Sequence, residues 1–233
     1  MTERFFLRML AIGLTAMLLY GCTPSGTSLS GHFENSGGIL FLDEITPEKT
    51  VVTLDTILLV NGNFNYRFKP EYEGIYRLRA NDTSLLPFVA GGNDNLTFSG
   101  DARNLTGSYR VSGNISSQML WETNRRVHEM YRLTDSLSKI FMEAQRTNSP
   151  PPPSLDSCYY THFLACKSAL AALIENHPSE LAAISIFHQR IGVNRFFSEQ
   201  NDSALYRMMK EKLVAAHPDN PHIKALQEEF EYE

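Results

Sequence analysis

Short runs of alternating apolar and polar residues fill the first half of the chain, from residue 31 to residue 113. In one run, Phe64, Tyr66 and Phe68 are separated by single polar residues, which is the two-residue period of a half-buried strand. The Asn-Gly pair at 61–62 stands just before this run, and both residue types adopt the positive φ angles of a tight hairpin turn. This region is therefore predicted to form strands joined by turns.

The alternating runs, together with the Gly- and Asn-rich segments between them, predict eight strands. Their expected bounds are residues 30–34, 38–42, 50–59, 63–68, 74–79, 85–90, 95–99 and 108–112. Many short strands at this spacing favour an antiparallel β-sandwich or a partly open barrel.

After residue 113 the period of the apolar positions changes to three or four residues, which is the period of a helix. The apolar stripe consists of Met119, Leu120, Thr123, Val127, Met130, Thr134, Leu137, Phe141 and Ala144. It predicts a long amphipathic helix at residues 116–146, with Asn114 or Ser116 as its N-cap and with Leu137 buried. Four prolines at 150–153 end it, and a stiff polyproline II spacer is expected there.

Further helices are predicted at residues 154–176, 180–190, 202–216 and from 220 onward, with Ser154 and Asp202 as N-caps. The fold class is thus α+β, with an antiparallel β-domain at 31–113 and an α-helical bundle at 114–233, broken by the Pro-rich stretch at 149–154. Several aromatic residues in this half could line a groove, but their helical spacing favours core positions. These are Trp121, Tyr131, Tyr159, Tyr160, Phe163, Phe187, Phe196 and Phe197.

The N-terminus has the features of a secretory signal. Arg4 and Arg8 precede a short apolar run at 9–19, and Leu19-Tyr20-Gly21-Cys22 resembles the lipobox of bacterial lipoproteins, with Tyr20 departing from the usual small residue. The resemblance implies a signal peptide at 1–21, acylation of Cys22 with chains such as palmitate, and a flexible tether at 22–30. An uncleaved membrane anchor is the alternative. No acidic run follows Cys22. In Bacteroidetes lipoproteins such a run resembles a signal for export to the cell surface, so its absence favours an envelope protein facing the periplasm, with the inner or outer membrane left open.

Charge and motifs restrict the function further. The formal net charge of −5 argues against nucleic acid as a partner. No His, Cys, Asp or Glu spacing typical of a metal site occurs, and neither does a nucleophile elbow nor a phosphate-binding glycine loop. No catalytic residue, cofactor or metal is therefore predicted, and an enzymatic activity is not favoured.

Cys158 and Cys166 are the only thiols after Cys22. They form no C-x-x-C motif, and on one helix their Cα atoms would lie about 12 Å apart, too far for a disulfide. Free thiols in the helical core are the favoured interpretation. A thiol pair remains the alternative if the helix begins late, because an oxidising compartment promotes disulfides.

Three short triplets resemble the O-glycosylation motif of Bacteroidetes periplasmic proteins. Each consists of an aspartate, a hydroxyl residue and a small or apolar residue, and the candidate acceptors are Thr56, Ser136 and Ser203.

Several motifs together resemble a β-domain of unknown function that stands at the N-terminus of many Bacteroidetes lipoproteins. They lie at residues 53–56, 61–66, 74–78 and 109–114, and the stretches at 177–180 and 217–221 resemble the helical segment that follows. In those relatives a thioredoxin-like domain of the peroxiredoxin or thiol-disulfide oxidoreductase kind comes last, and no residue here corresponds to its active site. We therefore expect a membrane-anchored, non-catalytic protein- or peptide-binding module. The alternatives are a shortened thiol-disulfide oxidoreductase and a small-ligand binder that uses the β-domain.

Overall fold

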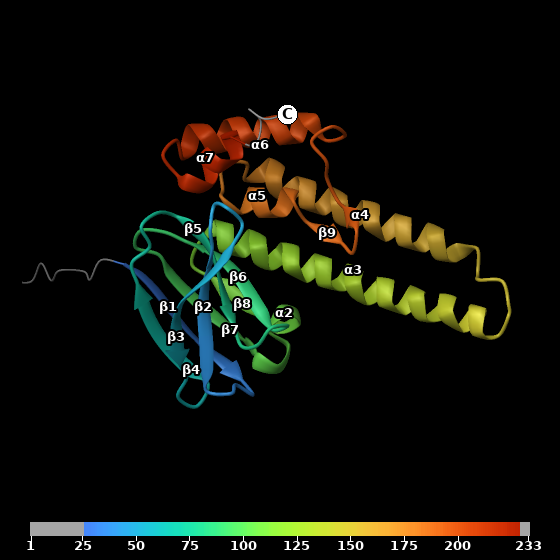
Figure 1. Cartoon of the computed structure of the whole chain (residues 1–233), viewed down its shortest axis with the longest axis horizontal. Coiled ribbons are helices and arrows are strands. Elements are labelled where there is room, and N and C mark those ends of the chain that lie inside the picture. The colour runs from blue at the N-terminus through green and yellow to red at the C-terminus, as the bar shows by residue number, and fades with distance from the viewer. Residues whose placement is uncertain (1–25, 229–233) are drawn as a thin grey trace, which may run out of the picture.

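The computed structural model describes residues 26–228 and shows a mixed α+β protein (Figure 1). Two four-stranded sheets come first along the chain and the helices follow, so the predicted α+β class is confirmed. Neither sheet closes on itself, so a closed barrel does not form among these residues.

The first sheet has the strand order β4-β1-β7-β8 and the second has the order β3-β2-β5-β6. The strands of the first sheet are β1 (Thr27–Glu34), β4 (Asn63–Phe68), β7 (Asn95–Asp101) and β8 (Arg110–Ser112). Those of the second are β2 (Ile39–Ile45), β3 (Val51–Leu58), β5 (Gly74–Arg79) and β6 (Leu85–Ala90). All eight predicted strands are present, with bounds that differ by a few residues.

Two features of the first sheet differ from the prediction. Strand β1 begins at Thr27, inside the segment predicted to be a tether, because Thr27, Leu29 and Phe33 all have fully buried side chains. In addition, β1 pairs with β7 in parallel, so the β-domain is not purely antiparallel. Residues 27–30 are thus bound between two strands, and the predicted tether is wrong over that stretch.

The tight turn predicted at Asn61 and Gly62 is confirmed, and paired backbone hydrogen bonds between Val60 and Asn63 close it. It joins β3 of the second sheet to β4 of the first, so the flanking strands do not pair with each other as the predicted hairpin required. The φ angles of Asn61 and Gly62 are 51° and 79°, and β4 begins at the next residue. A Cβ atom on Gly62 would lie 2.5 Å from the carbonyl oxygen of Phe33, so glycine is needed here for space as well as for its φ angle.

Aromatic rings fill the space between the two sheets. Phe98 of β7 and Phe88 of β6 meet edge to face, with ring centroids 5.3 Å apart, and Phe64 of β4 stacks on Phe33 of β1 at 5.7 Å. These rings belong to one buried cluster with members from both sheets. The two sheets therefore enclose a common apolar core.

The connection from β7 to β8 contains helical turns that the sequence pattern did not indicate. They are η2 (Ala102–Asn104) and α2 (Leu105–Ser108), capped by Asp101 and Asn104. Strand β8 consequently begins at Arg110 and is only three residues long, instead of the five predicted.

Two long helices dominate the second half of the chain. α3 (Ile115–Arg146) and α4 (Ser154–Asn176) run side by side and extend well beyond the sheets (Figure 1). Asn114 caps α3 by accepting a 2.8 Å hydrogen bond from the amide of Ser117. The proline run lies in the loop that joins these two adjacent helices, so it does not hold them apart as a spacer. Pro153, and not Ser154, stands at the N-cap of α4, and no side chain caps that helix.

Leu137 is half-buried, which corrects the prediction of a buried position. Phe141 and Ile140, close by on α3, are 44% and 46% exposed. The reason is that this part of the hairpin lies beyond the sheets, so fewer elements pack against α3 than nearer its start (Figure 1).

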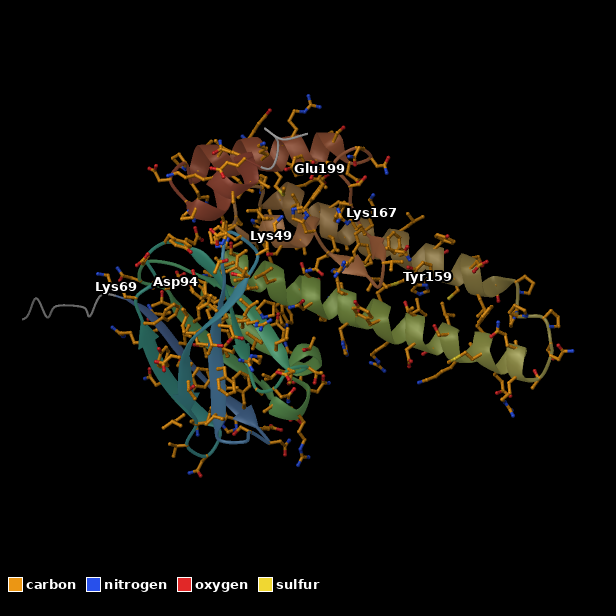
Figure 2. All side chains as sticks on the ribbon, viewed as in Figure 1. Lys49, Lys69, Asp94, Tyr159, Lys167 and Glu199 are labelled. Carbon is orange, nitrogen blue, oxygen red and sulfur yellow. The ribbon has the colours of Figure 1, made fainter. Side chains whose placement is uncertain are left out.

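The remaining elements pack on the start of this hairpin. They are α5 (Ala182–Phe187), β9 (Arg190–Ile191), β10 (Asn194–Arg195), α6 (Ser203–Ala216) and α7 (Pro221–Glu228). The third predicted helix is shorter than expected, because the β9–β10 hairpin takes up residues 190–195. Asp202 stands at the N-cap of α6 as predicted, but its carboxylate pairs with Lys167 of α4 at 2.7 Å and does not cap the helix. Figure 2 marks Lys167 on α4.

The helices pack directly on the second sheet. Ile75 of β5 and Val89 of β6 belong to the same buried cluster as Leu170 and Ile186. The hydroxyl of Ser117 on α3 donates to the carbonyl oxygen of Val89 at 2.9 Å. The contact between the sheets and the helices therefore contains both an apolar core and buried hydrogen bonds.

Candidate functional site

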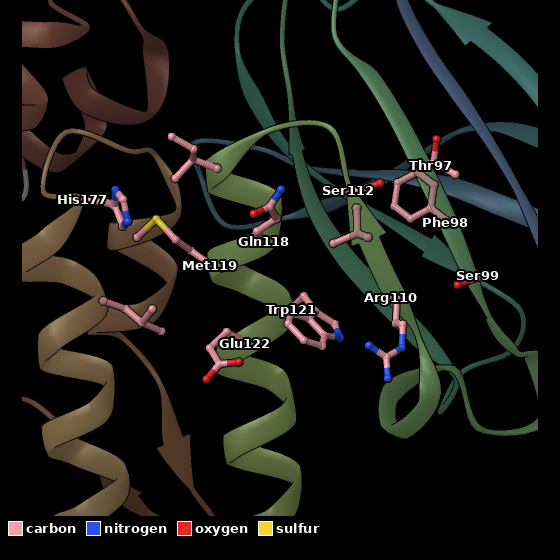
Figure 3. Close-up of a pocket in the computed structure, with 13 residues that line it drawn as sticks. Thr97, Phe98, Ser99, Arg110, Ser112, Gln118, Met119, Trp121, Glu122 and His177 are labelled. Carbon is pink, nitrogen blue, oxygen red and sulfur yellow. The ribbon is translucent and has the colours of Figure 1, made fainter.

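A cleft of about 630 Å³ opens where the first sheet meets the helical hairpin (Figure 3). Its walls come from β7, β8, the first turns of α3 and the end of α4. The lining residues are Thr97, Phe98, Ser99, Arg110, Val111, Ser112, Ile115, Gln118, Met119, Trp121, Glu122, Leu173 and His177.

Trp121 is the single tryptophan of the chain, and it is half-buried in this cleft. Its indole Nε1 donates a 2.7 Å hydrogen bond to the carbonyl oxygen of Tyr109, which fixes the ring against the start of β8. The Tyr109 hydroxyl in turn accepts a 2.8 Å bond from Asn124, and burial raises the pKa of Tyr109. The hydrogen bond to Tyr109 thus fixes the Trp121 ring, while part of the ring remains accessible from the cleft.

Arg110 supplies the uncompensated charge of the cleft. Its guanidinium carbon lies 5.9 Å from the centre of the Trp121 ring, within the range of a cation–π contact. Among residues 26–228 no carboxylate lies within ion-pair distance of Arg110, whereas Glu122 is already paired with Arg126 at 2.7 Å and with Arg125 at 3.0 Å. Burial acts to raise the pKa of Glu122, but these two arginines outweigh it and lower the pKa. Because Glu122 is neutralised by its two arginine partners, the charge of Arg110 leaves the cleft with a net positive charge.

Hydroxyl groups cover the strand side of the cleft. Thr97 of β7 faces Ser112 of β8, and Ser99 faces Arg110, so all four side chains lie on the outer surface of the sheet. Ile115, half exposed at 47%, adds apolar surface on the helix side. The cleft combines the accessible ring of Trp121 with apolar side chains, hydroxyls and the Arg110 guanidinium, groups that can make apolar, hydrogen-bond and ionic contacts with a bound segment.

The structure separates the predicted cysteine pair from this cleft. Cys158 and Cys166 are both inside α4 and both are free, Cys158 half-buried and Cys166 buried. Burial raises the pKa of Cys166 to about 11, which disfavours a thiolate.

His162 Nδ1 lies 3.8 Å from the Cys158 sulfur, but it also lies 2.8 Å from the carbonyl oxygen of Cys158. A carbonyl oxygen only accepts hydrogen bonds, so Nδ1 carries a hydrogen and is not free to take a proton from the thiol. Within the described part of the chain, no three His, Cys, Asp or Glu side chains gather as they would around a metal ion.

The other predicted site residues do not come together. Thr56 on β3, Ser136 on α3 and Ser203 at the start of α6 are each exposed, as a glycosylation acceptor must be, but they lie on three separate elements. Cys22 and the signal sequence lie outside the described residues. No helix between residues 26 and 228 is both long and apolar enough to span a membrane.

The aromatic residues expected in the core differ in burial. Tyr159 and Phe163 are half-buried and pack against the helical core. Phe187, Phe196 and Phe197 are buried as predicted. Tyr131 and Tyr160 are exposed, and Trp121 lines the cleft. The sequence contained one usable signal for this site, the only tryptophan of the chain, but nothing in its spacing distinguished a groove position from a core position.

Comparison with known proteins adds no relative. No family model, no curated protein and no solved structure shows significant similarity to this chain. The resemblance to the N-terminal region of thioredoxin-like lipoproteins therefore stays a prediction from sequence motifs.

Proposed function

We propose that this protein is a lipid-anchored, non-catalytic protein of the bacterial envelope that faces the periplasm and binds a peptide segment of a partner protein in the Trp121 cleft. In this proposal Cys22 carries the acyl chains, and the body is a β-sandwich followed by a helical bundle, related to the N-terminal region of thioredoxin-like lipoproteins. Two or more acyl chains provide durable anchoring, because each buried methylene adds to membrane affinity and a single chain is marginal.

The observation that carries the binding function is the arrangement of Trp121 and Arg110. A fixed, half-accessible indole lies beside an arginine without a carboxylate partner. Tryptophan and arginine are among the residue types that contribute most binding energy at protein interfaces. The hydroxyls of Thr97, Ser99 and Ser112 offer hydrogen bonds to a peptide backbone, and the positive balance favours acidic side chains in the ligand.

The shortened oxidoreductase is the weaker candidate. A redox centre requires an accessible thiolate, and Cys166 is buried with a raised pKa, while the histidine beside Cys158 already donates its Nδ1 hydrogen to a carbonyl group. The small-ligand alternative places the ligand in the mouth of the β-domain, whereas the 630 Å³ cleft lies outside the sheet, against α3.

The single tryptophan permits a direct binding test. Peptides selected from a random library on the immobilised full chain should change the intrinsic fluorescence on titration, because the only indole lies in the cleft. Arg110→Gln should weaken binding at least about tenfold, and the control Arg103→Gln, an exposed arginine outside the cleft, should bind like the parent. Selected peptides that bind both variants equally would place the binding site elsewhere.

The anchoring part of the proposal has its own test. Cys22→Ala should leave the protein unacylated and move it from the membrane to the soluble fraction. Unchanged membrane fractionation of this variant would contradict the lipobox interpretation and would favour an uncleaved anchor.

A further inference from the structure

A second cavity, of about 300 Å³, lies at the junction between the second sheet and the C-terminal helices. Segments that are far apart in the sequence meet there. They are the β2–β3 turn with Lys49, strand β5, helix α5, the β9–β10 hairpin and helix α7. Figure 2 shows Lys49 where the sheets approach these helices. This cavity shares no lining residue with the Trp121 cleft.

Two arginines of the β9–β10 hairpin line this junction cavity. Arg190 and Arg195 are direct partners across the two strands, so their side chains lie next to each other. Like charges directly opposite in a strand pair repel each other. Within residues 26–228 neither arginine pairs with a carboxylate, so no described acidic group offsets the repulsion. Lys49 and His188 line the same cavity and add to its basic character.

His222 adds a polar group to the wall of the cavity. It lies in the first turn of α7, has only 8% of its surface exposed and lines the cavity. Its buried Nε2 has no hydrogen-bond partner in the described part of the chain, which is rare for a buried polar atom. Its backbone amide is already occupied by the Asn220 side chain at 2.9 Å. A bound oxygen atom would satisfy Nε2.

The nearby acidic groups do not fill this role. The negative charges of Glu44 and Glu48 act on the imidazole of His222, but neither residue lines the cavity. The Glu44 carboxylate accepts a 2.7 Å hydrogen bond from the Tyr72 hydroxyl, and Glu48 is exposed. Among the described residues, no carboxylate therefore lines the cavity or pairs with the two arginines.

The rest of the wall is apolar. Ile45, Ile75, Ile184 and Leu226 line the cavity opposite the basic groups. An inorganic anion would leave this surface without contacts, whereas a compact hydrocarbon group would cover it. We propose that the junction cavity binds a small organic anion, with one carboxylate or phosphate group held by Arg190, Arg195 and His222 and an apolar body packed against the isoleucines.

Isothermal titration of the full chain tests this directly. Hexanoate and hexyl phosphate are the probes, with 1-hexanol as the neutral match and inorganic phosphate as the headgroup alone. At least one hexyl anion should bind saturably and tighter than both 1-hexanol and inorganic phosphate, and the tighter of the two anions identifies the headgroup class. Binding of 1-hexanol as tight as that of the anions, or saturable binding by neither anion up to millimolar concentrations, would overturn the proposal.

Variants locate the binding. Arg195→Gln should weaken binding of the anion at least about tenfold. Two control variants should bind it like the parent: Arg207→Gln, which changes an exposed arginine of α6, and Arg110→Gln, which changes the Trp121 cleft. Arg195 is exposed, so its loss should not prevent folding, and without ligand Arg195→Gln should melt at the same or a higher temperature than the parent because the repulsion with Arg190 is removed. Ala225→Phe, which fills the cavity and keeps every charge, should also abolish binding. Parental anion affinity in both Arg195→Gln and Ala225→Phe would refute the site.

Discussion

Replacing Asp43 with asparagine should destabilise the second sheet by an amount that depends on pH. Asp43 lies on β2 with no exposed side-chain surface, and its carboxylate receives 2.9 Å and 2.8 Å hydrogen bonds from Arg77 and Arg79 of β5. The hydroxyl of Thr53 on β3 donates a third bond at 2.7 Å. Asp43 thus connects three neighbouring strands at the point where the β2–β3 register shifts.

The magnitude follows from the carboxyl pKa. Burial alone would raise it, but the hydrogen bonds from Arg79, Thr53 and Arg77 outweigh burial and lower the pKa from 3.8 to about 2. At about 1.4 kcal/mol for each pKa unit, the ionised form contributes about 2.5 kcal/mol to folding. Asp43→Asn should therefore lower the free energy of unfolding at pH 7 by about 2–3 kcal/mol, since both arginines also lose their counter-charge.

The sign of the pH dependence is fixed by the direction of the shift. The folded-state pKa lies below the unfolded one, so the stabilisation is fully present above about pH 4 and is lost as the pH falls toward 2. Urea unfolding of parent and Asp43→Asn at several pH values should show the two midpoints converging at low pH, with equal slopes.

A matched control separates this buried network from an exposed ion pair. Asp135 forms a 2.6 Å pair with Lys139, but both side chains are more than half exposed. Asp135→Asn should change stability by no more than about 0.5 kcal/mol. A similarly small effect of Asp43→Asn at pH 7, or a difference that persists unchanged at pH 2, would refute the reasoning.

Three further predictions concern the turn, the hairpin and the thiols. Gly62→Val should lower the free energy of unfolding in urea by at least about 2 kcal/mol, because the new Cβ would meet backbone atoms and the φ angle at this position is positive. Gly37→Val, at an open position, should lower it little, and equal unfolding midpoints for the two variants would contradict this prediction. Leu137→Asp should cost only about 1–2 kcal/mol because the site is half-buried, and complete unfolding would show that another surface covers it. When the native protein is treated with a thiol reagent, Cys166 should react slowly and Cys158 faster, because Cys166 is buried and its pKa is raised. Both thiols should react fully in denaturant, and rapid labelling of Cys166 in the native protein would support a redox role.

Local features of the fold could be predicted because they depend on neighbours in the sequence. The alternation around Phe64, the turn at Asn61 and Gly62 and the cap at Asn114 each follow from residues a few positions apart. The start of β1 could not be predicted, since Thr27 belongs to a polar stretch whose burial depends on pairing with residues 63–68 and 95–101. Only the tertiary fold brings those strands together.

The candidate sites were harder to predict for the same reason. The Trp121 cleft combines residues 97–99, 110–122 and 173–177, and the junction cavity combines residues 45–49, 184–195 and 222–226. Arg190 and Arg195 are neighbours only because an unpredicted hairpin of two-residue strands places them opposite each other. The burial of His222, which leaves its Nε2 without a hydrogen-bond partner among the described residues, likewise depends on the tertiary fold and not on its sequence neighbours.

Photocrosslinking in living cells tests the central claim, that a partner protein occupies the Trp121 cleft. Gln118, exposed within the cleft, is replaced by p-benzoylphenylalanine, and Arg132, exposed on the same helix outside the cleft, serves as the control position. We expect one discrete crosslinked species from position 118 and none from position 132, and we expect that species to disappear when Arg110→Gln is added. Equal crosslinking from both positions, or an undiminished species in the Arg110→Gln background, would contradict this claim.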